Sequence, residues 1–315
     1  MTEILTISLN PAIDLSTTVD QVVAGPKLRC TTPRTDPGGG GVNVARTICK
    51  FGGDVTALIA VGGATGDKLL GLLADERLIT HPVRVSGETR QSFAVMDESN
   101  SAQFRFSVPG EPLTVDESNL LVAEIAAAAP QDGLVVLSGR ATPGLPVDFT
   151  ARIRAAIEPR TDKLVVDTSG PALAGLIARP TSPLHVLRVD QNEAEEASGR
   201  SMKSVADSLR FAQDLIARGV ARIVVTGRGS EGSILATCDQ RYFCHPPVVP
   251  VRSKIGAGDA FVGSMTLALS RDEPLGVALQ WGVAAASATV QTEGTALCDL
   301  DSCAALLQLC KVAPI

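Results

Sequence analysis

The chain has 315 residues, of which 45% are hydrophobic and 20% are charged, and its formal net charge is −6. This composition is typical of a globular protein with one large domain or two smaller ones. The negative charge argues against nonspecific binding to nucleic acid or to an anionic membrane. The seven cysteines form no C-x-x-C pair and the three histidines are far apart, so no zinc pattern is present. We therefore expect reduced thiols in a cytoplasmic protein.

Short apolar runs recur along the chain, and most are followed by a helical pattern such as 204–219. The runs lie at residues 4–9, 55–61, 133–138, 163–168, 184–189 and 222–227. This alternation predicts one α/β domain over residues 1–315, with a mostly parallel sheet covered on both faces. The longest uncharged run, 274–292, contains Gln, Ser, Thr and Gly, so it is predicted to be a buried helix and not a membrane span. The first residues lack the basic segment of a signal peptide.

Two stretches break the alternation of strand and helix. Residues 15–35 and 91–108 show polar alternation typical of hairpin-like β structure, and neither is followed by a helix. Such strands do not belong to the parallel sheet. They either form a small separate layer, such as a lid, or extend the sheet as an antiparallel edge.

Four successive glycines at 38–41 lead into a helix that is predicted to begin near Val42. Glycines let a ligand approach the backbone closely, and the start of a helix attracts an anion. The stretch has neither the Gly-Lys-Ser/Thr of a Walker A loop nor a G-x-G-x-x-G fingerprint. The sequence therefore favours an anion site of another kind, with a flexible turn as the simpler interpretation.

The segment around these glycines is basic in an otherwise acidic chain. Residues 21–46 carry one acidic side chain, Asp36, and four basic ones: Lys27, Arg29, Arg34 and Arg46. Four positive charges and one negative charge leave a local excess of +3. The excess is consistent with an anionic small ligand held next to the glycines, or with a solvated basic face.

The heptapeptide IGAGDAF, residues 255–261, places a carboxylate directly after a glycine pair and before an apolar helix. Asp259 could simply stabilise the positive end of that helix. Alternatively, the N–H groups of Gly256, Ala257 and Gly258 bind an anion, and Asp259 is the base beside it.

A third glycine-rich turn, 226–232, follows a predicted strand. Open α/β sheets bind ligands at such places, although a plain β-turn explains the glycines too.

Five motifs in this order resemble the ribokinase-like carbohydrate kinases of the PfkB family, and the resemblance covers nearly the whole chain. The motifs are NPAID (10–14), PGGGGVNVAR (37–46), DQNE (190–193), GSEG (229–232) and IGAGDAF (255–261). Residues 27–46, 89–91 and 105–110 are most similar to the branch of minor bacterial 6-phosphofructokinases, which phosphorylates sugar phosphates. The resemblance implies a three-layer sandwich with a mostly parallel central sheet. It also implies a small β lid, formed by about 13–36 and 88–108, that pairs two subunits.

The resemblance further implies a glycolytic reaction, the ATP-dependent phosphorylation of fructose 6-phosphate at O1 to fructose 1,6-bisphosphate. Its partners would be ATP and a phosphorylated ketohexose, with Mg²⁺ entering as MgATP and potassium as a further ion that relatives often bind. Fructose 1-phosphate kinases and tagatose-6-phosphate kinases remain alternatives within the family. A catalytically weakened sugar-phosphate-binding protein is an alternative of another class. A Rossmann oxidoreductase is not favoured, because no G-x-G-x-x-G follows the first strand.

Site roles follow from the same resemblance. Asp259 would be the general base, and the amides of Gly256, Ala257 and Gly258 would stabilise the transferring phosphoryl group. The positions implied for the sugar phosphate are Asp14, Lys27, Arg29, Gly39, Gly40, Asn43, Arg90, Arg105, Ser138 and Arg140. Those implied for the nucleotide are Arg188, Asp190, Thr226, Gly227, Gly229, Gly232, Val251, Val283 and Ser287. Those implied for ions are Asp190 and Glu193 for magnesium through water, and the carbonyls of Ser253 and Ile255 for potassium.

Three departures from the family pattern stand out. The chain reads Arg188-Val-Asp190 where the family commonly has Lys-Pro-Asn. Arg140 replaces a small polar residue near the expected sugar phosphate, and the turn at 226–232 carries one extra residue. These changes bear on metal affinity and substrate identity more than on the fold. For Asp190 we expect either contact with a magnesium-bound water or an outward, solvated side chain.

Overall fold

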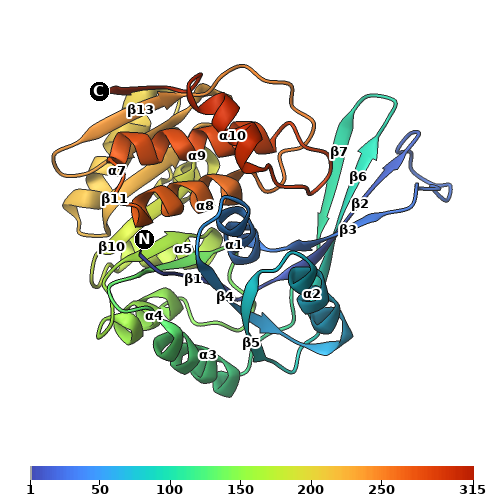
Figure 1. The fold of residues 1–315 in the computed structure, drawn as a ribbon, viewed down its shortest axis with the longest axis horizontal. Coiled ribbons are helices and arrows are strands. Elements are labelled where there is room, and N and C mark those ends of the chain that lie inside the picture. The colour runs from blue at the N-terminus through green and yellow to red at the C-terminus, as the bar shows by residue number, and fades with distance from the viewer. Residues whose placement is uncertain (1) are drawn as a thin grey trace.

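Ten strands form the central sheet in a computed structural model that describes residues 2–315 (Figure 1). Their order across the sheet is β14-β13-β12-β11-β10-β9-β8-β1-β4-β5. The parallel strands are β1 (Ile4–Ser8), β4 (Val55–Val61), β5 (Ile79–Arg84), β8 (Leu134–Ser138), β9 (Leu164–Asp167), β10 (Leu184–Asp190) and β11 (Ala221–Gly227). The antiparallel strands are β12 (Ser233–Ala236), β13 (Arg241–His245) and β14 (Lys311–Pro314). The predicted apolar runs thus form the parallel part of the sheet.

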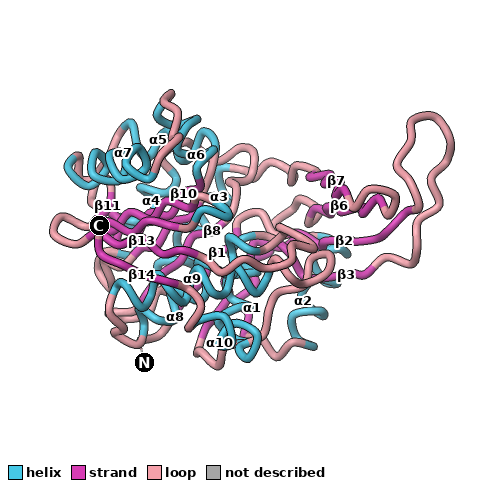
Figure 2. The backbone as a smooth tube through the Cα atoms, turned by 90° about the horizontal axis from the view of Figure 1, so that it is seen from above, coloured by secondary structure: helices cyan, strands magenta, loops and turns pink. Residues whose placement is uncertain are grey.

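Helices cover both faces of this sheet, which gives three layers (Figure 2). One face carries α1 (Gly40–Lys50), α2 (Gly63–Asp75), α8 (Ala257–Ser270), α9 (Leu275–Thr289) and α10 (Leu300–Leu307). The other carries α3 (Val115–Ala128), α4 (Phe149–Ile157), α5 (Gly170–Ala178), α6 (Gln191–Ser198) and α7 (Val205–Ala217). Neighbouring strand residues face opposite cores, as Ile4 and Leu5 do, because side chains alternate along a strand. The predicted three-layer α/β fold is confirmed.

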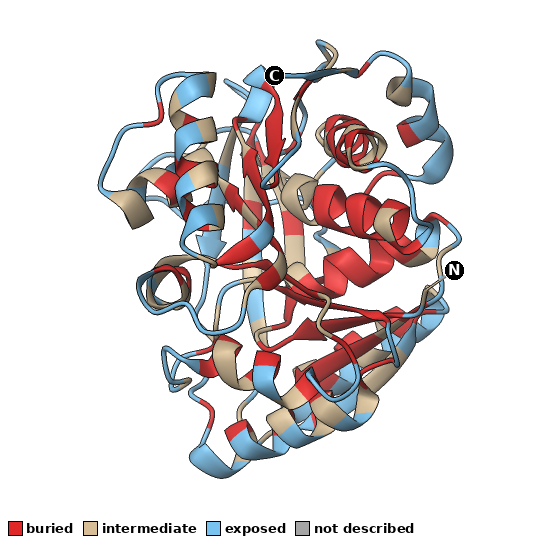
Figure 3. Cartoon of the chain, turned by 90° about the vertical axis from the view of Figure 1, so that its left-hand side faces the viewer, coloured by how far each residue is buried: buried red, intermediate tan, exposed pale blue. Residues whose placement is uncertain are grey.

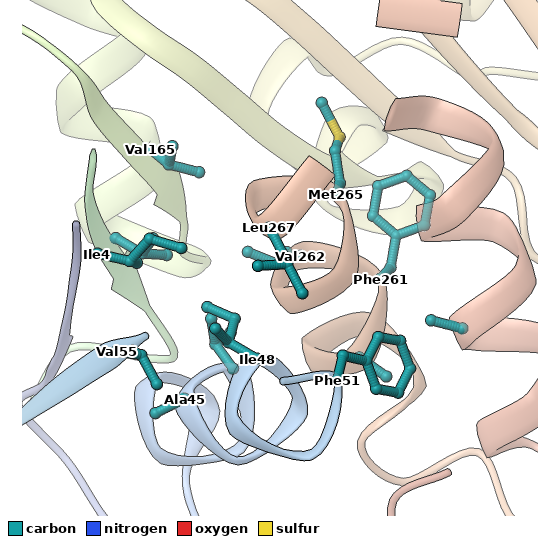
Figure 4. Packing of buried hydrophobic residues seen from close by; sticks show 14 of the residues in the cluster. Ile4, Ala45, Ile48, Phe51, Val55, Val165, Phe261, Val262, Met265 and Leu267 are labelled. Carbon is teal, nitrogen blue, oxygen red and sulfur yellow. The ribbon is translucent and has the colours of Figure 1, made fainter. Parts of the chain in front are cut away.

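The core under the site is built from α1, α8 and α9, and most residues of these helices are buried. Figure 3 shows buried helices packed against the buried strands of the sheet. Ile48 of α1, and Phe51 just after that helix, lie beside Val262 and Leu267 of α8 (Figure 4). The run predicted as a buried helix is α9, which confirms that prediction. No helix in the described part of the chain is long and apolar enough to span a membrane.

The two irregular stretches form a separate four-stranded sheet that projects from the body (Figure 1). Its strands, in the order β3-β2-β6-β7, are β2 (Ala12–Val19), β3 (Arg34–Gly38), β6 (Arg90–Asp97) and β7 (Ala102–Ser107). The outer pairs are antiparallel, whereas β2 and β6 run parallel. Of the two arrangements considered, a separate layer is therefore correct and an edge extension is not. Residues 20–33 form a long loop, so the first hairpin contains less strand than predicted.

Helix α1 begins at Gly40, two residues before the predicted start at Val42. The backbone of the glycines already follows the helical path, and the amide of Asn43 donates to the carbonyl of Gly39 at 2.9 Å. Only glycine fits there: a Cβ on Gly41 would lie 2.2 Å from the carbonyl oxygen of Ile7. Gly41 therefore allows the first turn of α1 to pack directly against the end of β1.

Candidate active site

A pocket of about 190 Å³ lies where the small sheet meets the first turns of α1 and α8. The small sheet contributes Asp14, Leu15, Arg90, Ser92, Phe93, Ala94, Arg105, Phe106 and Ser107. The body contributes Gly39, Gly40, Asn43, Ile255, Gly256, Asp259 and Thr295. Most of the residues predicted for the sugar phosphate and for catalysis are thus brought together. Ser92, Ser107 and Thr295 are additions; of these, only Ser107 lies in a stretch that carried the family resemblance, and no site role was predicted for it.

The floor of this pocket is the N-terminus of α8. Gly256 adopts a left-handed conformation (φ 76°), and no side chain caps the helix that begins at Ala257. The first amides of a helix have no partner within it, so here they are free to bind an anion. Asp259 lies in the same first turn. The helix start and the predicted anion hole are therefore one and the same feature, and the two interpretations of the motif do not compete.

Asp259 is held by a hydrogen bond across the floor of the pocket. The Nδ2 of Asn43, on α1, donates to Oδ2 of Asp259 at 2.9 Å. Burial raises the pKa of Asp259 to about 7, although the Asn43 hydrogen bond opposes the rise. The negative charge of Asp167 raises the pKa further and the positive charge of Arg188 lowers it. A carboxylate with a pKa near the working pH is well suited to accept a proton.

Arg46 fixes the amide of Asn43 from behind. Its Nη1 donates to Oδ1 of Asn43 at 3.2 Å and to the carbonyl of Pro37 at 2.8 Å. Its Nε and Nη2 donate to the carboxylate of Glu76 at 2.7 and 2.6 Å. Since Arg46 is only 2% exposed, its charge serves this internal network and not a ligand.

One interpretation of the basic segment 21–46 places its excess positive charge next to the ligand. The segment contributes less charge to the pocket than that interpretation requires. Arg34 pairs with Asp36 at 2.8 Å, and Asp36 also accepts from the hydroxyl of Thr295 at 2.6 Å. Lys27 and Arg29 are exposed in the loop after β2 and do not line the pocket. Their assignment to the sugar phosphate stays a prediction.

The wall opposite Asp259 carries two guanidinium groups from the small sheet. Arg90 of β6 donates to Oγ of Ser92 at 2.8 Å. Arg105 of the neighbouring β7 is exposed and donates to none of the described residues. Asp14 lies on β2 between this wall and the floor; burial raises its pKa, while the charge of Arg90 opposes the rise. The wall is therefore suited to an anionic group next to polar hydroxyls.

Ser138 and Arg140 lie just behind the first turn of α1, in an adjoining hollow. A Cβ on Gly40 would lie 2.7 Å from Oγ of Ser138, which shows how closely these segments pack. Oγ of Ser138 donates to Asp167 at 3.1 Å. Ser138 and Arg140 do not line the Asp259 pocket, and their role toward a sugar phosphate stays a prediction.

Arg188 of β10 lies beside the α8 N-terminus. Its Nη1 is 3.1 Å from Oδ1 of Asp167, and a Cβ added to Gly258 would lie 3.5 Å from the same Nη1. A Cβ added to Gly227 would lie 3.3 Å from Nη2. A positive charge therefore stands next to the free amides of the floor. Asp167, which holds this charge in place, was missed by the motif search; its signal was its position at the carboxyl end of a predicted strand.

Asp190 and Glu193 hydrogen-bond to each other's backbone, and their contact with a magnesium-bound water stays a prediction. Oδ1 of Asp190 accepts from the amide of Glu193 at 2.9 Å, and Oε2 of Glu193 accepts from the amide of Asp190 at 2.7 Å. This reciprocal pair is a capping box at the start of α6. Burial raises the pKa of Glu193 to about 7, although the Asp190 amide opposes the rise. Within residues 2–315 no cluster of three acidic, His or Cys side chains forms a cation site.

The remaining positions predicted for the nucleotide lie at the ends of β11 and on α9. Thr226 is buried, and Gly227 closes β11. Gly229 begins a single 3₁₀ turn, and Gly232 follows its end. Val283 and Ser287 of α9 are buried, whereas Val251 is 59% exposed. None of them lines the Asp259 pocket, so their contact with a nucleotide stays a prediction.

The loop before α8 has the features of a monovalent cation site. Among the described residues, none donates a hydrogen bond to the carbonyl oxygens of Ser253 and Ile255. Oγ of Ser253 donates to the carbonyl of Gly294 at 2.6 Å and accepts from the amide of Ile255 at 3.2 Å. Two free carbonyls on a fixed loop suit potassium, which takes oxygen ligands from the backbone.

Comparison with known proteins agrees with this geometry. The sequence model of the pfkB family carbohydrate kinases matches residues 1–303. The ATP-dependent 6-phosphofructokinase isozyme 2 of Mycobacterium tuberculosis (strain ATCC 25618 / H37Rv) is 38% identical over 299 residues, which cover 95% of this chain and 87% of that protein. The 1-phosphofructokinase of Xanthomonas campestris pv. campestris is 32% identical over 271 residues, which cover 85% of this chain and 84% of that protein.

A solved structure with the same fold is phosphofructokinase-2 from Escherichia coli in complex with potassium. The TM-score is 0.93 and the sequence identity 34%, and the match covers 98% of this chain and 99% of that one. The ribokinase-like fold and the ATP-dependent sugar-phosphate kinase activity implied by the motifs are thereby confirmed. The chain belongs to the pfkB family of carbohydrate kinases.

Proposed function

We propose that this chain transfers the γ-phosphoryl group of ATP to O1 of fructose 6-phosphate. The observation that carries the proposal is a pocket that can bind an anion at each of its two ends. The free amides of α8 lie at the floor, and Arg90 and Arg105 lie on the opposite wall. A substrate with a phosphate at one end and a reacting hydroxyl at the other matches both ends. An unphosphorylated sugar would leave the two guanidinium groups without a partner.

The floor supplies the chemistry. Asp259 accepts the proton of the O1 hydroxyl as this oxygen attacks the γ-phosphorus, and ADP leaves on the far side. The amides of Gly256, Ala257 and Gly258 then stabilise the charge on the transferring phosphoryl group, because they are fixed donors at the start of a helix. Arg188, held by Asp167, adds a positive charge beside them.

Magnesium would enter as MgATP, where it neutralises phosphate charge. The carboxylates of Asp190 and Glu193 fit this ion through its water shell, because magnesium usually keeps several waters. The two free carbonyls of Ser253 and Ile255 would hold potassium, the ion present in the E. coli phosphofructokinase-2 structure. Gln103 of the small sheet donates to Oγ of Ser253 at 3.2 Å, which ties that loop to the sugar-phosphate wall.

A homodimer formed through the small sheet is part of this proposal. Phe93, Phe104 and Phe106 of that sheet are 42%, 37% and 54% exposed, and a partner sheet would cover them. E. coli phosphofructokinase-2 has also been solved with fructose-6-phosphate and in a tetrameric inhibited form, so pairing of dimers is a further possibility to measure. All seven cysteines are free, in keeping with a reducing cytoplasm.

ATP turnover with a panel of sugars tests the proposal. The panel contains fructose 6-phosphate, fructose 1-phosphate, tagatose 6-phosphate and fructose, and ADP release is measured for each. We expect the highest kcat/KM with fructose 6-phosphate. A higher value with fructose 1-phosphate would favour the 1-phosphofructokinase alternative, which the Xanthomonas relative supports. Binding of fructose 6-phosphate without turnover would identify a weakened binding protein and contradict the role of Asp259.

A further inference from the structure

A second pocket, of about 200 Å³, lies between α4 and α5, away from the kinase site. Leu184, at the start of β10, lines it, whereas the kinase-site residue Asp190 ends the same strand. The six steps of about 3.3 Å between these residues separate the two ends by roughly 20 Å. The family motifs contain none of the residues that line this pocket.

The unusual residue of this pocket is Arg154 of α4. It is only 4% exposed, and its Nε and Nη1 are buried without a hydrogen-bond partner among the described residues. Its Nη2 reaches no closer than 3.6 Å to a carboxylate oxygen of Glu158, whose side chain is 58% exposed. A buried guanidinium with unmade hydrogen bonds is strongly unfavourable. Two of the three guanidinium nitrogens therefore lack a hydrogen-bond partner among the described residues, and the third makes only the long ion pair with Glu158.

The other residues that line the pocket indicate which kind of molecule would fit it. Four further lining residues, Thr150, Arg179, Thr181 and Ser182, have side chains that can donate hydrogen bonds. Apolar side chains form the other part of the lining: Val147, Ala151, Leu176, Leu184 and Val220. One carboxylate, that of Asp148, also lines the pocket. The two basic groups outnumber it, and the volume admits a molecule of a few carbon atoms.

We propose that this pocket binds a small organic anion. Its carboxylate or phosphate head pairs with Arg154, and its short apolar body packs against Leu176, Leu184 and Val220. The site is separate from the kinase pocket and does not depend on which sugar phosphate the kinase uses. Arg154 has the geometry for it, since a guanidinium binds either head through two parallel hydrogen bonds.

Binding of three matched probes to the full chain tests the proposal. Butyrate and butyl phosphate share an apolar body and differ in the head, and n-butanol is the neutral control. We expect one or both anions, but not butanol, to raise the Tm and to bind in calorimetric titrations. Arg154→Met removes the charge at similar volume and should weaken the affinity at least about tenfold. The probe that binds identifies the head.

Two control variants separate this site from other cationic surfaces. Arg152→Met changes a neighbouring arginine of α4 that instead donates to Asn119 at 2.7 Å and does not line the pocket. Arg90→Ala disables the phosphate wall of the kinase site. The affinity of the probes should survive both changes. Equal binding to wild type and Arg154→Met, loss of binding in Arg90→Ala alone, or no binding of either anion would each overturn the proposal.

Hydrogen exchange of the wild-type protein provides a test that does not require the variant to fold. With saturating butyl phosphate or butyrate, we expect slower exchange in residues 176–184, which contribute much of the pocket. Protection confined to residues 255–259 would place the anion at the kinase site instead, and would contradict the proposal.

Discussion

The two walls of the kinase pocket are built differently. On the body wall, Asn43 and Asp259 are joined to each other and, through Arg46, to Glu76 and to the carbonyl of Pro37. On the small-sheet wall, Arg105 is exposed and makes no hydrogen bond to a described residue, and Phe106 behind it is 54% exposed. The groups proposed for the chemical step are therefore held by the core. The groups proposed to recognise the sugar phosphate lie on a sheet with exposed side chains.

Asp259→Asn is the most severe test of the body wall. Asparagine keeps the size of the side chain and can still accept from Asn43, but it cannot take a proton. We expect kcat to fall by at least ~10²-fold, while circular dichroism and the Tm show an intact fold. Turnover near that of the wild type in a folded protein would reduce Asp259 to a residue of the helix start.

Arg90→Ala tests the small-sheet wall in the same assay. A charge-assisted hydrogen bond to a phosphate contributes about 1.5–3 kcal/mol, so KM for fructose 6-phosphate should rise about 10- to 100-fold. The KM for unphosphorylated fructose should change little. Arg84→Ala is the matched control, since Arg84 pairs with Asp67 on the surface. Equal effects of Arg90→Ala on the two sugars would remove Arg90 from the phosphate site.

The dependence of activity on pH also tests the contrast between the two walls, because the proposed base, Asp259, lies on the body wall and its pKa is raised there. Asp259 acts as a base when it is deprotonated, so activity should be present above its pKa of about 7 and be lost as the pH falls through that value. The amide of Asn43 opposes the rise of this pKa. Asn43→Ala should therefore move the acid limb of kcat/KM to higher pH, by up to about one unit. A limb that stays in place or moves to lower pH would contradict the assignment.

Asp190→Asn should have the smallest effect on turnover. Asparagine also caps helices, so α6 should persist, and we expect activity within about tenfold of the wild type. Loss of one carboxylate should shift the dependence on free magnesium to higher concentration at fixed MgATP. Asp299→Asn is the matched control, because Asp299 caps α10 through the amide of Ser302. Superimposable magnesium titrations of wild type and Asp190→Asn would show that Asp190 serves the helix alone.

The sequence predicted the parts of this molecule in which local pattern and geometry coincide. The apolar runs and the motif at 255–261 could be interpreted directly, because strand burial and a helix start depend on neighbouring residues. Contacts between side chains that are far apart in the sequence could not be predicted in this way. Asp167 meets Arg188 only after two strands come together. The charge of Arg46 seemed available to a ligand because its partner, Glu76, lies thirty residues away.

The hydrogen bonds of Arg46 have one more consequence, which concerns the direction of an amide. A guanidinium can only donate, so the atom of Asn43 that faces Arg46 must be oxygen. The NH₂ group is then obliged to face Asp259. The opposite orientation would set nitrogen against guanidinium and oxygen against carboxylate. Glu76, which is partly open to solvent, holds Arg46 in place. It therefore helps to determine that the NH₂ group of Asn43, and not its oxygen, faces Asp259.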